Sequence, residues 1–263
     1  VRCFDNKDII HVEGMVDSIR DIEIINLELV LADLESIGNR IDKIEKKARA
    51  TKDKDELVEL EALTKAKLAL EQNEALRTVD FTKEELHAIK SYNFLTLKPI
   101  IYMANINEDE IATEDNEYVK KVKEYASKEN AKVIKVCAKI EEELSQLDDD
   151  DHNDMLEALG IEMSGLDQLI KATYDLLGLA TYFTVGKDEV RAWTFKKGMN
   201  AKECAGIIHT DFERGFIRAE VMSYTDLVSC GSELKVKEAG RARLEGKDYL
   251  MQDGDICYFR FNV

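Results

Sequence analysis

The chain has 263 residues, more than one average domain, so we expect two or three domains. Its formal net charge of −17 argues against wrapping a nucleic acid by bulk electrostatics, because that mode needs Lys and Arg to displace counterions. No apolar run approaches the roughly 18 residues of a membrane span. Five scattered cysteines without a CxxC pair argue against a disulfide framework or a zinc site. We therefore expect a cytoplasmic protein that does not contact membranes.

The negative charge is unevenly distributed along the chain. Residues 187–263 carry 13 basic and 13 acidic side chains, whereas the first 186 residues carry 24 basic and 41 acidic ones. The C-terminal part is therefore the better candidate for contact with an anionic partner.

The first residues have no targeting character and are typical of the end of a strand. They are Val1-Arg2-Cys3-Phe4. We expect a further segment upstream of them.

Residues 17–49 are predicted to form a helix whose apolar residues recur, from Leu34, at the spacings of three and four that mark a coiled coil. A second helical run, with less regular leucines, follows the polar break at 51–55. We interpret the two as an antiparallel arm; a helical pair packed on the main body is the alternative. The repeating residues are Leu34, Ile37, Ile41, Ile44 and Ala48 in the first helix, and Leu57, Leu60, Leu63, Leu68 and Leu70 in the second.

After the arm, Thr82 and Glu85 predict a capping box that begins a short helix ending near Tyr92. This helix would return the chain to the main body.

The central part is predicted to be a βαβ unit. Its strands are 100–104, preceded by the only proline, Pro99, and 132–136, with a helix over about 116–130 between them. The loops after both strands, 105–108 and 137–139, should lie at one sheet edge, where ligands bind in open α/β sheets. An acidic helix near Asp148 to Asp151 and a helix from Ser164 through Leu177 should follow.

The last part is predicted to be a β-grasp module of short strands around one helix. A boundary is expected at Gly178 to Thr184. The predicted strands are 190–195, 217–222 and 256–261, and Asn200 with Glu203 begins the helix.

Several segments, spread over essentially the whole chain, resemble the YchF-type Obg-like ATPases. The longest lies in the C-terminal module and has the character of a TGS domain. The matching segments are Val1-Arg2-Cys3-Phe4, Val12-Glu13-Gly14, Asp21-Ile22-Glu23, Asn105-Ile106-Asn107-Glu108, Val190-Arg191-Ala192-Trp193-Thr194, residues 209–221 (HTDFERGFIRAEV) and Asp253-Gly254-Asp255-Ile256.

The resemblance implies an α/β fold with three parts. Residues 1–22 and 93–178 would form an incomplete P-loop NTPase sheet, the base-recognition half of a G domain. Residues 23–92 would form the inserted coiled-coil arm, and 179–263 the TGS β-grasp domain. It also implies nucleotide hydrolysis and association with ribosomes, and we expect a monomer.

The sequence differs from the family pattern in one respect, the segments that bind the phosphates of the nucleotide. The family's Gly-rich phosphate loop, switch segments and DxxG motif lie upstream of the stretch matched by Val1, and no G-x-x-x-x-G-K-[ST] occurs in the 263 residues. Phosphoryl transfer depends mainly on that loop and its Mg²⁺. The resemblance therefore implies that Mg²⁺ binds together with ATP or GTP. The protein ligands of this Mg²⁺ would lie outside this sequence. We expect no catalytic residue, no metal ligand and no hydrolysis in the chain as given.

The loop Asn105 to Glu108 occupies the place of the N-K-x-D motif, whose Asp accepts two hydrogen bonds from guanine in related GTPases. Glu108 is one methylene longer and cannot adopt the same geometry, while Ile106 would offer an apolar surface to either purine. Mismatched polar groups discriminate strongly, so we predict a preference for ATP over GTP. Asn105 should brace the loop, and Cys137, Ala138 and Lys139 should offer backbone donors and an aliphatic stem. The alternative is that Asn105 and Glu108 only cap the next helix.

The C-terminal module carries a basic cluster that would suit ribosomal RNA or protein, although acidic residues interrupt it. The alternative is that the module only packs on the G domain. The cluster is Lys235, Lys237, Arg241, Arg243 and Lys247.

The sequence is compatible with two classes of function. One is a nucleotide hydrolase of which this sequence is the larger part. The other is a nucleotide-free interaction protein that binds ribosomes or RNA through the arm and the TGS module.

Overall fold

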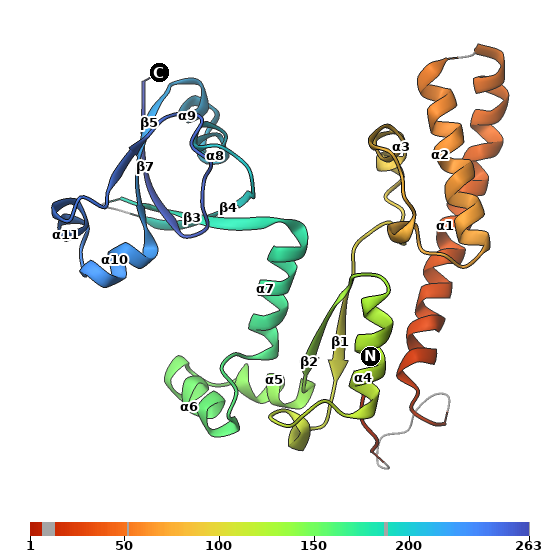
Figure 1. Cartoon of the computed structure of the whole chain (residues 1–263), viewed down its shortest axis with the longest axis horizontal. Helices are drawn as coiled ribbons and strands as arrows, with labels where there is room; N and C mark the ends of the chain where they lie inside the picture. The colour runs from red at the N-terminus through yellow and green to blue at the C-terminus, as the bar shows by residue number, and fades with distance from the viewer. Residues whose placement is uncertain (7–13, 52, 187–188, 263) are drawn as a thin grey trace. The chain divides into compact units, whose positions relative to one another are not determined.

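The computed structural model describes residues 1–6, 14–51, 53–186 and 189–262 (Figure 1). It divides into two compact units, Val1–Leu169 and Ile170–Val263. Val12, Glu13 and Lys52, which belong to the resemblance and to the predicted turn, lie outside the described residues, and so does the side chain of Ala48. No described helix is long and apolar enough to cross a membrane.

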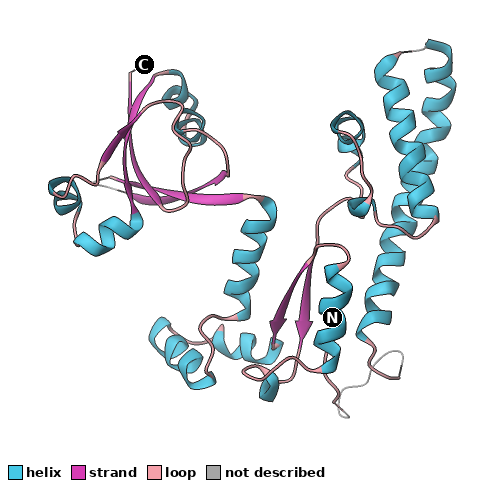
Figure 2. Cartoon of the chain, in the orientation of Figure 1, coloured by secondary structure: helices cyan, strands magenta, loops and turns pink. Residues whose placement is uncertain are grey.

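The predicted arm is a pair of helices, α1 (Ser18–Thr51) and α2 (Lys54–Glu71), that lie side by side (Figures 1 and 2). Ile37 and Ile44 of the predicted repeat are buried, and Leu34 and Ile41 pack against them. The prediction for α2 is wrong at Leu57 and Leu68, which are exposed. Alanines occupy much of the contact face instead, so the two helices can approach closely. The buried residues of α2 are Ala62, Leu63, Ala66, Ala69 and Leu70.

Buried polar contacts fasten the base of the arm to the rest of the unit. The carboxylate of Asp33 accepts hydrogen bonds from the backbone N–H groups of Leu95 and Thr96, at 2.9 and 2.8 Å, and from the Thr96 hydroxyl. Arg77 Nε donates to Glu129 at 2.8 Å, and their side chains are only 7% and 13% exposed. These contacts fix the base of the arm to the rest of the unit Val1–Leu169.

Short helices connect the arm to the sheet. They are η1 (Leu76–Thr78), α3 (Lys83–Ile89) and η2 (Lys90–Tyr92). The predicted capping box at the start of α3 is confirmed, because Thr82 and Glu85 exchange both hydrogen bonds.

The predicted βαβ unit is confirmed. Strands β1 (Ile101–Asn105) and β2 (Lys132–Val136) pair in parallel, and α4 (Glu117–Ser127) connects them. β1 begins one residue later than predicted. Val1 to Cys3 run beside β1, as expected for extended backbone: Asn105 N–H donates to the Val1 carbonyl at 2.8 Å, and Cys3 N–H donates to the Asn105 carbonyl at 2.7 Å.

Three helices follow β2: α5 (Ala138–Leu144), α6 (Asp149–Leu159) and α7 (Gly165–Leu177). The carboxylate of Glu141 in α5 accepts hydrogen bonds from the N–H groups of Gly165 and Leu166 at the start of α7. A Cβ atom at residue 165 would lie 2.7 Å from Val136 Cγ1, so only glycine permits this approach of α7 to β2.

The C-terminal unit holds a five-stranded sheet in the order β4-β3-β7-β5-β6, with β3 and β7 parallel. This mixed arrangement is the predicted β-grasp. The strands are β3 (Leu179–Val185), β4 (Val190–Lys196), β5 (Phe216–Ser223), β6 (Arg243–Glu245) and β7 (Asp255–Phe261), and the helices are α8 (Ala201–Ile208), α9 (Thr210–Arg214), α10 (Tyr224–Cys230) and α11 (Glu233–Glu238).

The segment Gly178 to Thr184, where the sequence predicts a domain boundary, also forms most of strand β3, which the sequence analysis did not predict. Its buried residues Ala180 and Tyr182 alternate with less buried ones, which is the two-residue period of a strand. The Tyr182 hydroxyl donates to the Cys204 carbonyl of α8 at 2.8 Å. Burial raises the pKa of the Cys204 thiol to about 12, and all five cysteines are free.

A matched pair of substitutions in α2 tests the packing of the arm. Leu63 is fully buried and Leu68 is 55% exposed, so Leu63→Ala should cost about 2–5 kcal/mol of unfolding free energy. Leu68→Ala should stay within about 0.5 kcal/mol of the wild type. Chemical denaturation followed by circular dichroism measures both. Equal losses would show that α1 and α2 do not pack through this face.

Candidate base-recognition site

The residues that follow β1 and β2 are held together by a hydrogen bond. Oδ1 of Asn105, the last residue of β1, accepts from the backbone N–H of Ala138, the first residue of α5, at 3.0 Å. The backbone of Asn105 is itself fixed by its bonds to Val1 and Cys3. Asn105 therefore holds the two strand ends together, whereas the sequence analysis expected it to brace the loop that follows it.

The expected role of Ile106 does not agree with the structure. Its side chain is 2% exposed and belongs to the core cluster that also holds Tyr102 and Ala104. These three residues alternate along one face of β1, and the Ile106 N–H continues the sheet by donating to the Val136 carbonyl at 2.8 Å. The side chain therefore cannot lie against a purine.

Glu108 lies in the short helix η3 (Glu108–Glu110) and forms an ion pair with Lys139 of α5. Both side chains are more than half exposed, so the pair contributes little to stability. The hydrogen bond from Lys139 to Glu108 raises the pKa of Lys139 above its ordinary value. The pair brings the Glu108 carboxylate to α5, next to the Asn105–Ala138 contact.

The segment at 137–139 is not the predicted loop. Cys137 is the residue before α5 and is buried, while Ala138 and Lys139 are the first residues of the helix. The Ala138 N–H, expected to be available to a ligand, already donates to Asn105.

The sequence interpretation missed a second set of residues that hold the loop Asn105 to Glu108 in place. The Asn107 N–H donates to Glu110 Oε2 at 3.2 Å, and Asn116 Nδ2 donates both to Glu110 Oε1 and to the Cys3 carbonyl. Asn107 with Glu110 has the spacing of a capping box, which was the available signal. The contacts of Asn105 and Glu108 described above run to α5, so capping of the next helix is not their role.

The basic cluster of the C-terminal unit is largely paired with acidic residues of the same unit. Lys237 pairs with Glu220 at 2.5 Å, Arg241 with Asp226 at 2.9 Å, and Arg243 with Glu245 at 3.2 Å. Of the predicted set, only the side chains of Lys235 and Lys247 lack an ion pair with any described residue. The cluster therefore offers less uncompensated charge than its sequence indicates.

No group of three or more His, Cys, Asp or Glu side chains suited to a metal ion occurs in the described part of the chain.

Comparison with known proteins shows the family. The chain is 58% identical to the ribosome-binding ATPase YchF of Bacillus subtilis, with all of this chain and 72% of that protein covered. This chain belongs to the YchF family of Obg-like ATPases. It is also 43% identical to Obg-like ATPase 1 of Homo sapiens, over all of this chain and 67% of that protein.

Two further comparisons agree with this membership. The YchF GTPase of Schizosaccharomyces pombe has a solved structure that matches with a TM-score of 0.84 and 34% identity, over 99% of this chain and 70% of that one. The match confirms the predicted α/β fold. Residues 179–262 match the family model YchF-GTPase_C, described as "Protein of unknown function (DUF933)".

The hydrogen bond between Asn105 and Ala138 can be tested by hydrogen exchange at the Ala138 amide. Asn105→Ala removes the acceptor of the Ala138 N–H, and a hydrogen bond contributes about 1 kcal/mol. Exchange of the Ala138 amide, measured by hydrogen–deuterium exchange with NMR, should therefore accelerate roughly fivefold. Asn105→Asp keeps an acceptor oxygen and should leave the exchange rate near that of the wild type. Unchanged exchange in Asn105→Ala would contradict the brace.

Proposed function

We propose that this protein is an ATPase that prefers ATP to GTP and associates with ribosomes, and that the 263 residues supply the base-recognition half of its nucleotide site. Membership of the YchF family supports nucleotide binding and hydrolysis, since the relatives are named ribosome-binding ATPases and Obg-like ATPase. The observation that carries the proposal is the brace between Asn105 and Ala138, with the Glu108 carboxylate beside it.

The preference for adenine follows from the state of the Glu108 carboxylate. Its Oε2 atom accepts a charge-assisted hydrogen bond from Lys139, so it is a weaker acceptor for a second donor than Oε1 is. Adenine offers one exocyclic amine, which a single oxygen can accept. Guanine offers a ring N–H and an exocyclic amine side by side and needs both oxygens. A donor left unsatisfied costs about 1–3 kcal/mol, or roughly 5- to 150-fold in affinity.

The remaining loop residues have supporting roles in this proposal. Asn105 holds the two strand ends together, and Ile106 anchors the loop in the core rather than contacting the base. Lys139 orients Glu108, and its aliphatic stem borders the site together with Cys137 and Ala138. The selectivity then depends on one carboxylate whose neighbours fix its direction.

Hydrolysis depends on groups that these residues do not provide. The sequence contains no G-x-x-x-x-G-K-[ST], and the described residues hold no group of three or more His, Cys, Asp or Glu side chains suited to a metal ion. Positioning and neutralising the phosphates with Mg²⁺ is most of phosphoryl-transfer catalysis. We therefore propose that the 263 residues alone bind a nucleotide through its base and do not hydrolyse it. We further propose that the protein is monomeric and cytoplasmic.

Calorimetric titration with ATP and GTP tests the proposal, using this sequence extended to the length of its YchF relatives. The wild type should bind ATP at least tenfold more tightly than GTP. Glu108→Asp should narrow this ratio, because the shorter carboxylate restores the guanine-reading geometry of the related GTPases. A wild-type preference for GTP would contradict the proposal.

Glu117→Asp is the matched control, because Glu117 is also an exposed glutamate paired with a lysine, Lys120. It should leave the ATP to GTP ratio unchanged. Ribosome co-sedimentation without binding of either nucleotide would favour the second function class, a nucleotide-free interaction protein.

A further inference from the structure

Two arginines lie opposite one another on neighbouring strands of the β-grasp sheet. The strand register pairs Arg218 of β5 with Arg260 of β7, and both are exposed. Neither side chain has a hydrogen bond or an ion pair with any residue that the structure describes. The Arg260 guanidinium lies 4.3 Å from the ring centroid of Tyr258, which is 50% exposed. We call these three residues the Arg218–Arg260 face.

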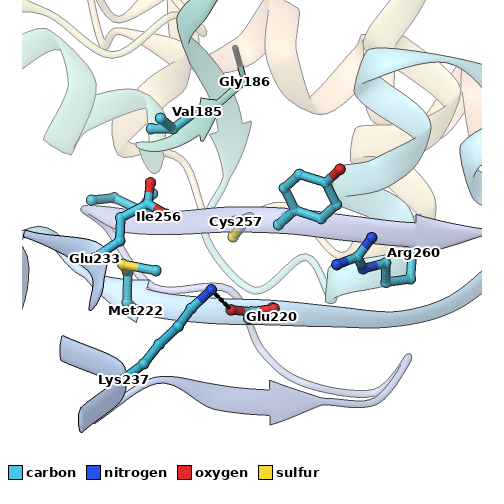
Figure 3. A pocket seen from close by; sticks show the side chains of 10 residues that line it. Val185, Gly186, Glu220, Met222, Glu233, Lys237, Ile256, Cys257 and Arg260 are labelled. Atoms are coloured by element: carbon cyan, nitrogen blue, oxygen red, sulfur yellow. Dashed lines mark ion pairs between the residues drawn. The ribbon is translucent and has the colours of Figure 1, made fainter. Parts of the chain in front are cut away.

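The face borders an open pocket of about 590 Å³ on the same side of the sheet. Figure 3 shows Arg260 toward one end of this pocket, the Lys237–Glu220 ion pair beside it, and Met222, Ile256 and Glu233 toward the other end. The pKa of Lys237 is raised, first by its hydrogen bond to Glu220 and also by the charge of Glu233, and the charge of Arg260 opposes this rise. The pocket lining therefore holds two cations, Arg260 and Lys237, and two carboxylates, Glu220 and Glu233.

The charges at this end are not balanced within the protein. Glu220 is engaged by Lys237, and Glu233 is the other carboxylate of the pocket lining. The guanidinium groups of Arg218 and Arg260 are left without a counter-charge. Like charges directly opposite on a sheet are destabilising, so an anion bound between them would relieve a cost that the free protein carries.

The chemistry of the face matches a nucleotide unit of a single strand. Guanidinium groups bind phosphate through two parallel hydrogen bonds. An exposed aromatic ring is a platform on which an unpaired base stacks, as in proteins that bind single-stranded nucleic acids. An acidic peptide would use the arginines but not the ring, and the bases of a duplex cannot reach a flat sheet surface.

We propose that the Arg218–Arg260 face binds single-stranded RNA, with phosphate at the two arginines and a base on Tyr258. The inference rests on the proposed ribosome association and names its RNA-contacting surface. It assigns this contact to β5 and β7, because Lys237, Arg241 and Arg243 of the sequence-predicted cluster are paired internally. A local contact of this kind is compatible with the net charge of −17, all of which is carried by residues 1–186.

Fluorescence anisotropy with a labelled twelve-nucleotide single-stranded RNA, at several salt concentrations, tests the proposal. Arg218→Ala with Arg260→Ala should lower the affinity about tenfold at 0.15 M salt and reduce the salt slope by about 1.4, as expected for two lost phosphate contacts. Tyr258→Ala should lower the affinity at least fivefold without changing the slope. Tyr258→Phe keeps the ring and should bind as the wild type does.

Arg191→Ala is the matched control. Arg191 is also an exposed arginine over an aromatic ring, 4.2 Å from the Trp193 centroid, but it has an ion pair with Glu189. Its substitution should change RNA affinity less than twofold. Thermal unfolding should show no loss of stability in Arg218→Ala, because the substitution removes a repulsion. An Arg191→Ala effect equal to that of the double variant would overturn the proposal.

Co-sedimentation with ribosomes and ATP binding are measured on the same proteins. Loss of ribosome binding in the double variant with unchanged RNA affinity would mean that the partner is a protein, and would overturn the RNA assignment. A wild type that binds ribosomes and ATP but not the RNA would overturn this inference alone. A wild type that does not bind ribosomes would contradict the proposed function instead.

Discussion

The parallel pairing of β1 with β2 is the constraint on which the candidate site depends. Parallel strands end at the same edge of a sheet, so Asn105 and Ala138 come together although they are far apart in sequence. The Asn105–Ala138 hydrogen bond then closes the gap between the strand ends, and Glu108 meets Lys139 on the same edge. The parallel pairing and these few contacts thus place a carboxylate at the edge where the two strands end.

The buried polar groups at the base of the arm connect the arm to this sheet. Asp33 of α1 holds Thr96, the Thr96 carbonyl accepts from the Arg77 N–H, and Arg77 pairs with Glu129. The Tyr102 hydroxyl of β1 lies 3.4 Å from the same carboxylate. Removing one partner of a buried ion pair costs about 3–5 kcal/mol, because the other charge is left uncompensated. The network therefore fixes the arm to the strand that carries Asn105.

Local periodicity predicted much of the fold, and its failures have physical causes. The three- and four-residue spacing gave α1, and the capping residues Thr82 and Asn200 marked helix starts correctly. Strand β3 was missed because only Ala180 and Tyr182 are buried along it, a weak signal in a stretch beginning with glycine. In α2 the contact face contains several alanines, which a search for leucines overlooks.

The residues of the candidate site lie together as the sequence predicts, but several of them have contacts that the sequence did not predict. The order of strands and loops was sufficient to place Asn105, Glu108 and Lys139 together. The direction of the Ile106 side chain depends on whether the strand pairing continues past Asn105. It does continue, because the Ile106 N–H donates to the Val136 carbonyl, and the side chain therefore faces the core. Ion pairs between distant residues, such as Lys237 with Glu220, cannot be seen in the sequence, and neither can the opposition of Arg218 and Arg260.

The central claim is that these residues read the base of the nucleotide, and nucleosides test it without any contribution from phosphates. Amide chemical shifts of the ¹⁵N-labelled chain would be followed by NMR during titration with adenosine and with guanosine. Adenosine should shift the amides of residues 105–108 and 137–139 in a saturable way, and guanosine should shift them much less. Larger shifts with guanosine, or adenosine shifts located elsewhere in the chain, would contradict the account.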